Sequence, residues 1–176
     1  MLSLLFHALL LCIQFSVSGR SPEQIEKWLE ESSWSVDAQY NLGIALMEGD
    51  GVPVDKPEAF KWFKKAAEAG IAKNHWRLGL CYDEGQGVAK NPEEAFKCFE
   101  KAANKGHLTS KVRVGLSYIE GNGVEADALR GQAWILIAAA DGSEAAQSCR
   151  DLLDKHIEKD QIAKAQKLAD KIMGAN

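Results

Sequence analysis

Apolar residues recur along this chain with helical spacing, and the pattern comes in alternating blocks. In the middle of the chain Leu78, Cys81 and Tyr82 follow the i, i+3, i+4 spacing of one helix face. A second apolar stripe follows, made of Ala95, Phe96, Phe99, Ala102 and Ala103. Because glycines separate the two stripes, the pattern predicts two antiparallel helices that face each other, here called helix A and helix B.

The whole block repeats every 36 residues without insertion or deletion. Gly-x-Gly-Val stands at residues 49–52, 85–88 and 121–124, and an Ala-Ala pair follows each copy at 66–67, 102–103 and 138–139. A period of this length is typical of stacked helical arrays. We therefore predict three units, at residues 35–70, 71–106 and 107–142, in which glycines end both helices.

One glycine lies inside each predicted helix A, at Gly43, Gly79 and Gly115. Such a glycine costs about 1 kcal/mol relative to alanine, so something must offset it. The simplest reason is close approach to helix B, where the matched positions hold Phe63, Phe99 and Ile135. Burial of each of these side chains would contribute roughly 1.5 to 3 kcal/mol.

The N-terminus differs from the repeats. No charged residue occurs from Leu2 to Val17, and the small residues Ser16 and Ser18 precede Gly19 at the −3 and −1 positions of a cleavage site. Residues 1–18 are therefore predicted to be a secretory signal peptide. The apolar run is shorter than the roughly 20 residues that span a bilayer, although an uncleaved anchor remains the alternative.

Residues 19–34 are predicted to form a capping helix. Ser21 and Gln24 match a capping box, with Pro22 in the first turn, and Ile25, Trp28 and Leu29 share one face. The segment has no Gly-x-Gly-Val copy, so it fits the end cap that an array needs.

Composition limits the classes of partner. The chain has 176 residues and 46% hydrophobic residues, and 21 Lys and Arg against 25 Asp and Glu give a net charge of −4. Nucleic acid is not expected as a ligand, because phosphate binding depends on clustered cations. No membrane span is expected once the signal peptide is removed.

The motifs resemble the Sel1-like repeat, a relative of the tetratricopeptide repeat. The resemblance rests on Leu-Gly, Glu-Gly-x-Gly-Val and Ala-Phe-Lys-x-Phe-x-Lys-Ala-Ala-x-x-Gly, found at 42–70 and 78–106. It extends to residue 142, where Gly131 and Gln132 replace Ala95 and Phe96, and residues 143–176 resemble a degenerate closing helix pair with Asp151 in place of glycine.

The resemblance implies an all-α fold, a right-handed α-solenoid of antiparallel helix pairs. It also implies that the concave surface lined by helix A binds a protein or peptide partner, as in relatives that act as adaptors. Arrays present one extended surface, which agrees with this role.

No catalytic, cofactor-binding or metal-binding residues are predicted. The chain lacks a Gly-x-Ser-x-Gly motif, and His75, His107 and His156 form no pair on one helix face, so they are expected at the surface. Some cysteine-rich relatives bind or slowly cleave β-lactams, but their paired cysteines at each helix junction are absent here. A small hydrolase of that type is the alternative function, and a structural spacer is the third.

Two sets of residues are candidates for specific roles. Cys81 and Cys98 are predicted at similar heights of one helix hairpin, so they are either bridged by a disulfide or free and buried. Asn41, Arg77 and Arg113 are in phase on helix A and are predicted to bind the partner. The alternative for the arginines is structural pairing with neighbouring acids such as Glu48, Glu84 and Glu120.

Overall fold

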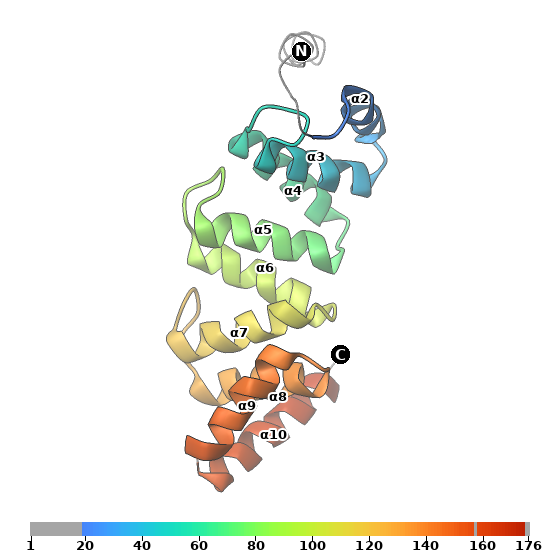
Figure 1. The fold of residues 1–176 in the computed structure, drawn as a ribbon. Coiled ribbons are helices and arrows are strands. Elements are labelled where there is room, and N and C mark those ends of the chain that lie inside the picture. The colour runs from blue at the N-terminus through green and yellow to red at the C-terminus, as the bar shows by residue number, and fades with distance from the viewer. Residues whose placement is uncertain (1–18, 157, 175–176) are drawn as a thin grey trace.

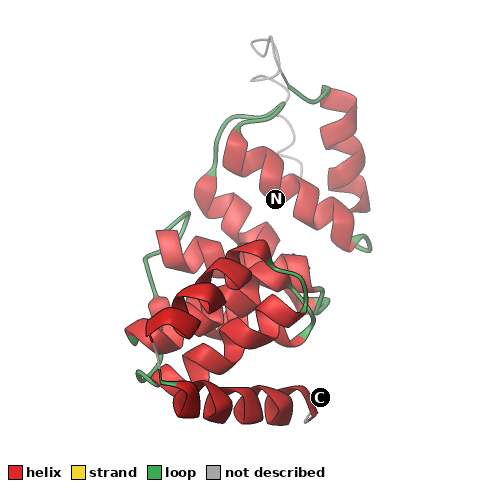
Figure 2. Ribbon diagram, turned by 60° about the horizontal axis from the view of Figure 1, so that its bottom comes forward, coloured by secondary structure: helices red, strands yellow, loops and turns green. Residues whose placement is uncertain are grey.

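The computed structural model describes residues 19–156 and 158–174, so the predicted signal peptide of residues 1–18 lies outside the described residues. Within the described residues the chain forms nine helices and no strand (Figure 2). The helices are α2 (Pro22–Glu31), α3 (Val36–Glu48), α4 (Lys56–Glu68), α5 (Ala72–Glu84), α6 (Pro92–Asn104), α7 (Leu108–Glu120), α8 (Ala128–Ala140), α9 (Glu144–His156) and α10 (Lys159–Gly174). They stack in chain order from α2 to α8, and α9 and α10 both pack on α8 (Figure 1). This arrangement confirms the predicted all-α solenoid.

Three helix pairs make up the body of the stack. Helices α3, α5 and α7 are the predicted helices A, and α4, α6 and α8 are the predicted helices B. Each helix A packs most extensively on the helix B that follows it, and each helix B packs in turn on the next helix A. In Figure 1 the long loops α5–α6 and α7–α8 lie on the left edge, whereas the short turns α4–α5 and α6–α7 lie on the right edge.

The helices A end at glycines, as the sequence predicts, and the helices B begin at N-cap side chains. Gly49, Gly85 and Gly121 end the helices A with left-handed backbones, at φ values of 75°, 74° and 71°. Each helix B begins at a side chain that accepts a hydrogen bond from a backbone N–H three residues later. These N-cap residues are Asp55, Asn91 and Asp127.

The second glycine of each loop joins one pair to the previous one. A Cβ atom on Gly87 would overlap the carbonyl oxygen of Lys56, at the start of α4, and one on Gly123 would overlap that of Pro92, at the start of α6. Gly51 lies in the same way against the carbonyl of Arg20, just before α2. Helix α2 therefore occupies the place of a helix B ahead of the first pair.

Helix α2 has the properties of the predicted cap. The Ser21 side chain accepts from the Gln24 N–H, as expected for its N-terminus. Ile25 and Trp28 are buried, and the outward positions carry charged residues such as Glu23 and Lys27. The end of the stack is thus covered by a polar face.

The glycines inside the helices A mark close helix contacts, as predicted. A Cβ atom on Gly43 would lie 2.5 Å from a ring carbon of Phe63, and one on Gly79 would lie 2.5 Å from a ring carbon of Phe99. Both phenylalanines are fully buried. The packing of the rings therefore offsets the helix propensity lost at the glycines.

The third pair stays well packed although Gly131 and Gln132 interrupt its sequence pattern. Every residue of α8 from Gly131 to Ala139 is buried, because α7, α9 and α10 all pack on this helix. Helix α10 covers α8 with Ala165, Leu168, Ala169 and Ile172.

The last two helices do not repeat the geometry of the earlier pairs. Helix α10 has little contact with α9 and packs mainly on α8. In Figure 2 this helix, which leads to the C label, lies across the end of the stack. The degenerate closing pair of residues 143–176 is therefore two helices that separately cover the third pair.

Candidate functional site

Helices α3, α5 and α7 form a row that we call the helix A row. Ion pairs connect its neighbouring helices along the row. Lys73 on α5 lies 3.1 Å from Asp37 on α3, and Arg113 on α7 lies 3.0 Å from Asp83 on α5. Side chains of successive helices A therefore reach one another along the row.

Apolar side chains repeat along the row at two positions. The first position holds Tyr40, Trp76 and Val112, and the second holds Ile44, Leu80 and Leu116. All six are half-buried, so part of each side chain faces solvent. The Tyr40 ring packs against Phe63 at 5.9 Å and the Trp76 ring against Phe99 at 5.0 Å, between ring centroids. The row thus carries partly exposed apolar groups on a rigid base.

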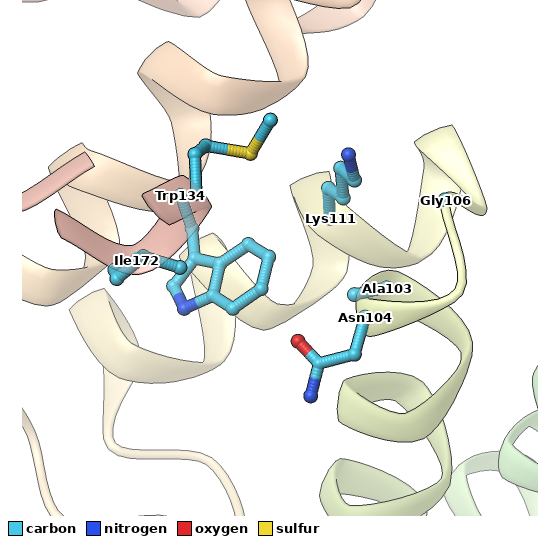
Figure 3. A pocket seen from close by; sticks show the side chains of 7 residues that line it. Ala103, Asn104, Gly106, Lys111, Trp134 and Ile172 are labelled. Atoms are coloured by element: carbon cyan, nitrogen blue, oxygen red, sulfur yellow. The ribbon is translucent and has the colours of Figure 1, made fainter. Parts of the chain in front are cut away.

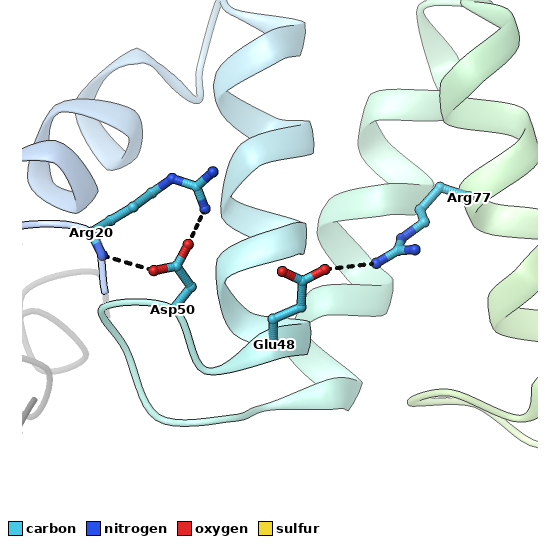
Figure 4. Close-up of polar contacts among 4 residues, drawn as sticks. All are labelled: Arg20, Glu48, Asp50 and Arg77. Carbon is cyan, nitrogen blue, oxygen red and sulfur yellow. Dashed lines mark hydrogen bonds and ion pairs between the residues drawn. The ribbon is translucent and has the colours of Figure 1, made fainter. Parts of the chain in front are cut away.

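Arg77 joins the first two pairs. Its guanidinium lies 3.6 Å from a carboxylate oxygen of Glu48 (Figure 4) and 5.4 Å from the centre of the Phe63 ring. The Nε atom is buried and has no hydrogen-bond acceptor among the described residues. The side chain as a whole is 23% exposed.

Arg113 repeats this arrangement one pair later. It binds Asp83 and lies 5.7 Å from the centre of the Phe99 ring, with 37% of its side chain exposed. Each arginine therefore packs on the phenylalanine of the preceding helix B. The prediction of the acids that pair with these arginines was partly wrong. Glu48 pairs with Arg77 as expected, but Asp83 pairs with Arg113. Glu84 instead accepts a hydrogen bond from Gln86.

Asn41 occupies the same position in the first pair and is half-buried. Its surroundings differ from those of the arginines, because the preceding helix α2 has Lys27 at the position that corresponds to Phe63 and Phe99. Nearby, Arg20 closes this end of the array by pairing with Asp50 through both its backbone N–H and its guanidinium (Figure 4). The three predicted partner-binding residues therefore occupy equivalent positions of the repeat but have different surroundings.

Cys81 and Cys98 are free thiols in this structure and lie in different clusters of the core. Cys81 packs with Met47, Ala59 and Phe63, whereas Cys98 packs with Ala67 and Leu78. Burial raises the pKa of each thiol to about 11. Both are therefore protonated at neutral pH and behave as small apolar side chains, and the disulfide remains a prediction.

The histidines are less exposed than the sequence predicts. His107 caps α7: its Nδ1 atom accepts from the Ser110 N–H at 3.2 Å, and its ring stacks on Trp76. Burial lowers the pKa of His107, and burial together with Lys101 and Lys105 lowers that of His75. The His156 side chain lies outside the described residues. Within the described part, no group of three His, Cys, Asp or Glu residues is placed to hold a metal ion.

The structure also contains a cavity that the sequence does not predict. A cavity of about 160 Å³ opens at the turn between α6 and α7, and Trp134 of α8 and Ile172 of α10 line it. These residues come from helices that are distant in sequence, so no motif marks the cavity.

The fold and the repeated contacts define a helical repeat protein that stacks paired helices into a solenoid. A sequence model of the Sel1 repeat matches residues 36–71, 75–107 and 110–143. The chain belongs to the Sel1 repeat family.

Solved structures agree. A Sel1 repeat protein from Oxalobacter formigenes is 34% identical, over 70% of this chain and 51% of that one, with a TM-score of 0.67. A protective antigen of uropathogenic Escherichia coli, described as having an SLR fold, is 26% identical over 84% of this chain and 32% of that one, with a TM-score of 0.73. This chain thus spans about half and about a third of these two proteins.

A third structure supports the fold alone. Cysteine rich protein B of Helicobacter pylori is 20% identical, over 71% of this chain and 96% of that one, with a TM-score of 0.58. No curated protein matches the chain. Among the helices of the described residues, none is long and apolar enough to cross a membrane.

Proposed function

We propose that this chain is a protein-interaction scaffold that holds a protein or peptide partner along the concave surface of the helix A row. The observation that carries the proposal is the repetition of one side-chain set at intervals of 36 residues. Partly exposed apolar residues such as Trp76 and Leu80 alternate along the row with partly exposed arginines. An extended partner could therefore make equivalent contacts with successive units.

The ion pairs of Arg77 and Arg113 do not exhaust their binding capacity. A guanidinium has five N–H donors, and its fork geometry suits carboxylates and backbone carbonyls. Glu48 takes one nitrogen of Arg77, and Asp83 takes one nitrogen of Arg113. We propose that the solvent-exposed donors among the remaining ones bind the partner, and that Asn41 offers its amide in the first unit.

A serine beside a histidine is the feature that could support the alternative function, a hydrolase. The Ser110 hydroxyl lies 2.9 Å from Nδ1 of His107. Ser110 is fully buried, however, and the same Nδ1 atom caps the helix N-terminus. A nucleophile must reach its substrate, so this pair is better explained as a helix cap.

The test of the scaffold is capture of the partner by variants. The wild-type protein is first used to isolate a partner from an envelope or secretory extract, and that partner is then purified. Arg77→Ala/Arg113→Ala should abolish its binding. Because these side chains are partly exposed, the loss of each ion pair should lower the free energy of unfolding by only about 0 to 1 kcal/mol.

The matched control changes two exposed lysines that lie outside the helix A row. Lys56 and Lys90 are exposed and form no ion pair within the described residues. Lys56→Ala/Lys90→Ala removes the same charge and should bind normally. Full binding by the arginine variant would refute the proposed site, and the absence of any partner would favour a structural spacer.

We further propose that the protein is exported, to the cell exterior, the periplasm or the lumen of the secretory pathway. Support comes from the predicted signal peptide and from Arg20, which is anchored on Asp50 directly after the predicted cleavage site. N-terminal sequencing of the protein from its native source should begin at or near Gly19. A sequence that begins at Met1 would contradict cleavage.

A further inference from the structure

We propose that the turn between α6 and α7 carries a second binding site, which takes one apolar side chain from an acidic segment of a partner protein. This site lies on the edge of the solenoid and does not include Arg77, Arg113 or the partly exposed apolar residues of the helix A row. Three observations carry it: a cavity with an apolar wall, and exposed lysines and exposed apolar residues along the same edge.

The cavity has an apolar wall and a polar rim. Trp134 faces Asn104 across it, and Lys111 and Gly106 lie along the other sides (Figure 3). Ala103 and Ile172 complete the apolar lining, together with Met173, which is 50% exposed. A side chain that enters the cavity would therefore contact the indole and aliphatic groups while its backbone meets polar atoms.

The size of the cavity indicates what it can hold. Sites for cofactors and drug-sized molecules usually have about 300 to 1,000 Å³, whereas this cavity has about 160 Å³. A single large apolar side chain is a better match. Anchor side chains that fill such a pocket contribute much of the affinity of protein interfaces.

The charge along this edge of the solenoid favours an acidic partner. Lys101 and Lys105 lie at the end of α6, both are exposed, and neither forms an ion pair within the described residues. Lys111 is 7% exposed and pairs with Asp141, so its charge is already compensated. Both lysines lie on the side of α6 that faces His75 of α5, so carboxylates of a partner would meet them along the edge, toward the turn before α5, and not in the cavity.

Apolar groups extend the surface beyond the cavity. Ile71 is 41% exposed just before α5, and Leu108 is 38% exposed at the start of α7. The two turns follow one another along the right edge in Figure 1. The amino group of Lys105 reaches the turn before α5, where it would lie 3.5 Å from a Cβ atom on Gly70.

The site arises where the array ends its regular pattern. Trp134 stands 36 residues after Cys98 and brings a large ring to a position that a small side chain fills in the second pair. Lys111 is in phase with Gln39 and His75. Helix α10 then covers α8 and supplies the remaining wall.

The test uses the full chain and a synthetic peptide. The probe is a short acidic peptide with one central phenylalanine, and binding is followed by NMR of the isotope-labelled protein. We expect shifts of the Trp134 indole N–H and of the backbone amides of Gly106 and Leu108. The Trp76 indole on the helix A row should not move.

Asn104→Trp blocks the cavity from an exposed position, so the fold should be kept. This variant should weaken peptide binding about tenfold or more, as should replacement of the peptide phenylalanine by alanine. Glu68 is exposed and in phase with Asn104, at the end of α4. Glu68→Trp is therefore the matched control, and it should bind normally.

Charge reversal tests the second part of the proposal. Lys101→Glu/Lys105→Glu should weaken binding severalfold and reduce its salt dependence, whereas Lys56→Glu/Lys90→Glu changes the net charge equally and should have little effect. Unchanged affinity of Asn104→Trp would overturn the proposal. It would also be overturned by shifts confined to the Trp76 indole and its neighbours on α5, or by self-association that buries this turn against a second copy.

Discussion

The second and third helix pairs share one backbone frame but fill it with different side chains. In α5–α6 a Cβ atom on Gly79 would lie 2.5 Å from the Phe99 ring. In α7–α8 a Cβ atom on Gly115 would lie 3.0 Å from Ile135 and 3.0 Å from the carbonyl oxygen of Gly131. The glycine thus faces an aromatic ring in one pair and an aliphatic side chain plus backbone in the other. Close packing within a pair therefore depends on the residues of helix B that face the glycine as well as on the glycine itself.

The outer sides of the two pairs differ in the same way. Arg113 covers Phe99 from the next helix A, whereas the residue in phase with it, Cys149, packs beside Ile135. Helix α6 keeps a charged outer face, but α8 is buried by α9 and α10. The third pair is therefore the transition between the regular array and its closing helices, and its aliphatic filling suits burial on all sides.

The largest expected effect comes from filling the contact at Gly79. Gly79→Leu should lower the free energy of unfolding by about 1 to 3 kcal/mol, because it overpacks against a fully buried ring. Urea denaturation followed by circular dichroism measures this change. An unchanged urea midpoint would show that the glycine has another purpose.

The alanine variants compare the two pairs directly. At Gly79 one methyl group already collides with Phe99, so Gly79→Ala should remain destabilising. At Gly115 the crowding is milder, and the gain in helix propensity of about 1 kcal/mol should largely offset it. Equal effects at the two positions would show that the difference in side-chain filling is unimportant.

The fold could be predicted because its determinants are local. Glycines, N-cap residues and apolar spacing repeat within each unit, so one unit predicts the others. The sequence does not predict that α2 corresponds to a helix B, because the buried residues of α2 do not follow the 36-residue register. Only the contact between Arg20 and Gly51 reveals it.

The candidate site was predictable only in part. The phase of Arg77 and Arg113 follows from the repeat, and the structure places both on the helix A row. Their partners Glu48 and Asp83 depend on the offset between neighbouring helices, which a single sequence does not specify. The edge cavity could not be predicted, because Trp134 and Ile172 meet only through the position of α10.

A smaller effect should appear on acidification at the junction of the two pairs. The lowered pKa values of His75 and His107 mean that the folded state disfavours their protonated forms. Above the ordinary pKa of 6.5 both rings are neutral and this stability is fully present. As the pH falls below that value, the unfolded chain binds protons first and stability decreases.

The variant His75→Gln/His107→Asn tests this dependence. Glutamine is the residue in phase with His75 in the first pair, and asparagine can still cap α7. Urea midpoints of the wild type should fall between about pH 6.5 and 5, before most carboxylates titrate, and those of the variant should fall less. Parallel curves for the two proteins would mean that other groups cause the decrease.

The smallest expected effect concerns the reactivity of the thiols, which separates the interior of the second pair from the outer side of the third. Cys81 and Cys98 are buried, with pKa values raised to about 11, whereas Cys149 is half-buried. At pH 8 only roughly a thousandth of each buried thiol is thiolate, so Cys149 should react first with iodoacetamide. Timed labelling followed by peptide mass spectrometry measures the order, and equally fast labelling of Cys98 would contradict the burial.

The same experiment on unfolded, unreduced protein tests the predicted disulfide between Cys81 and Cys98. If both thiols are free, both are labelled. If they form a disulfide, both stay unlabelled until a reductant is added.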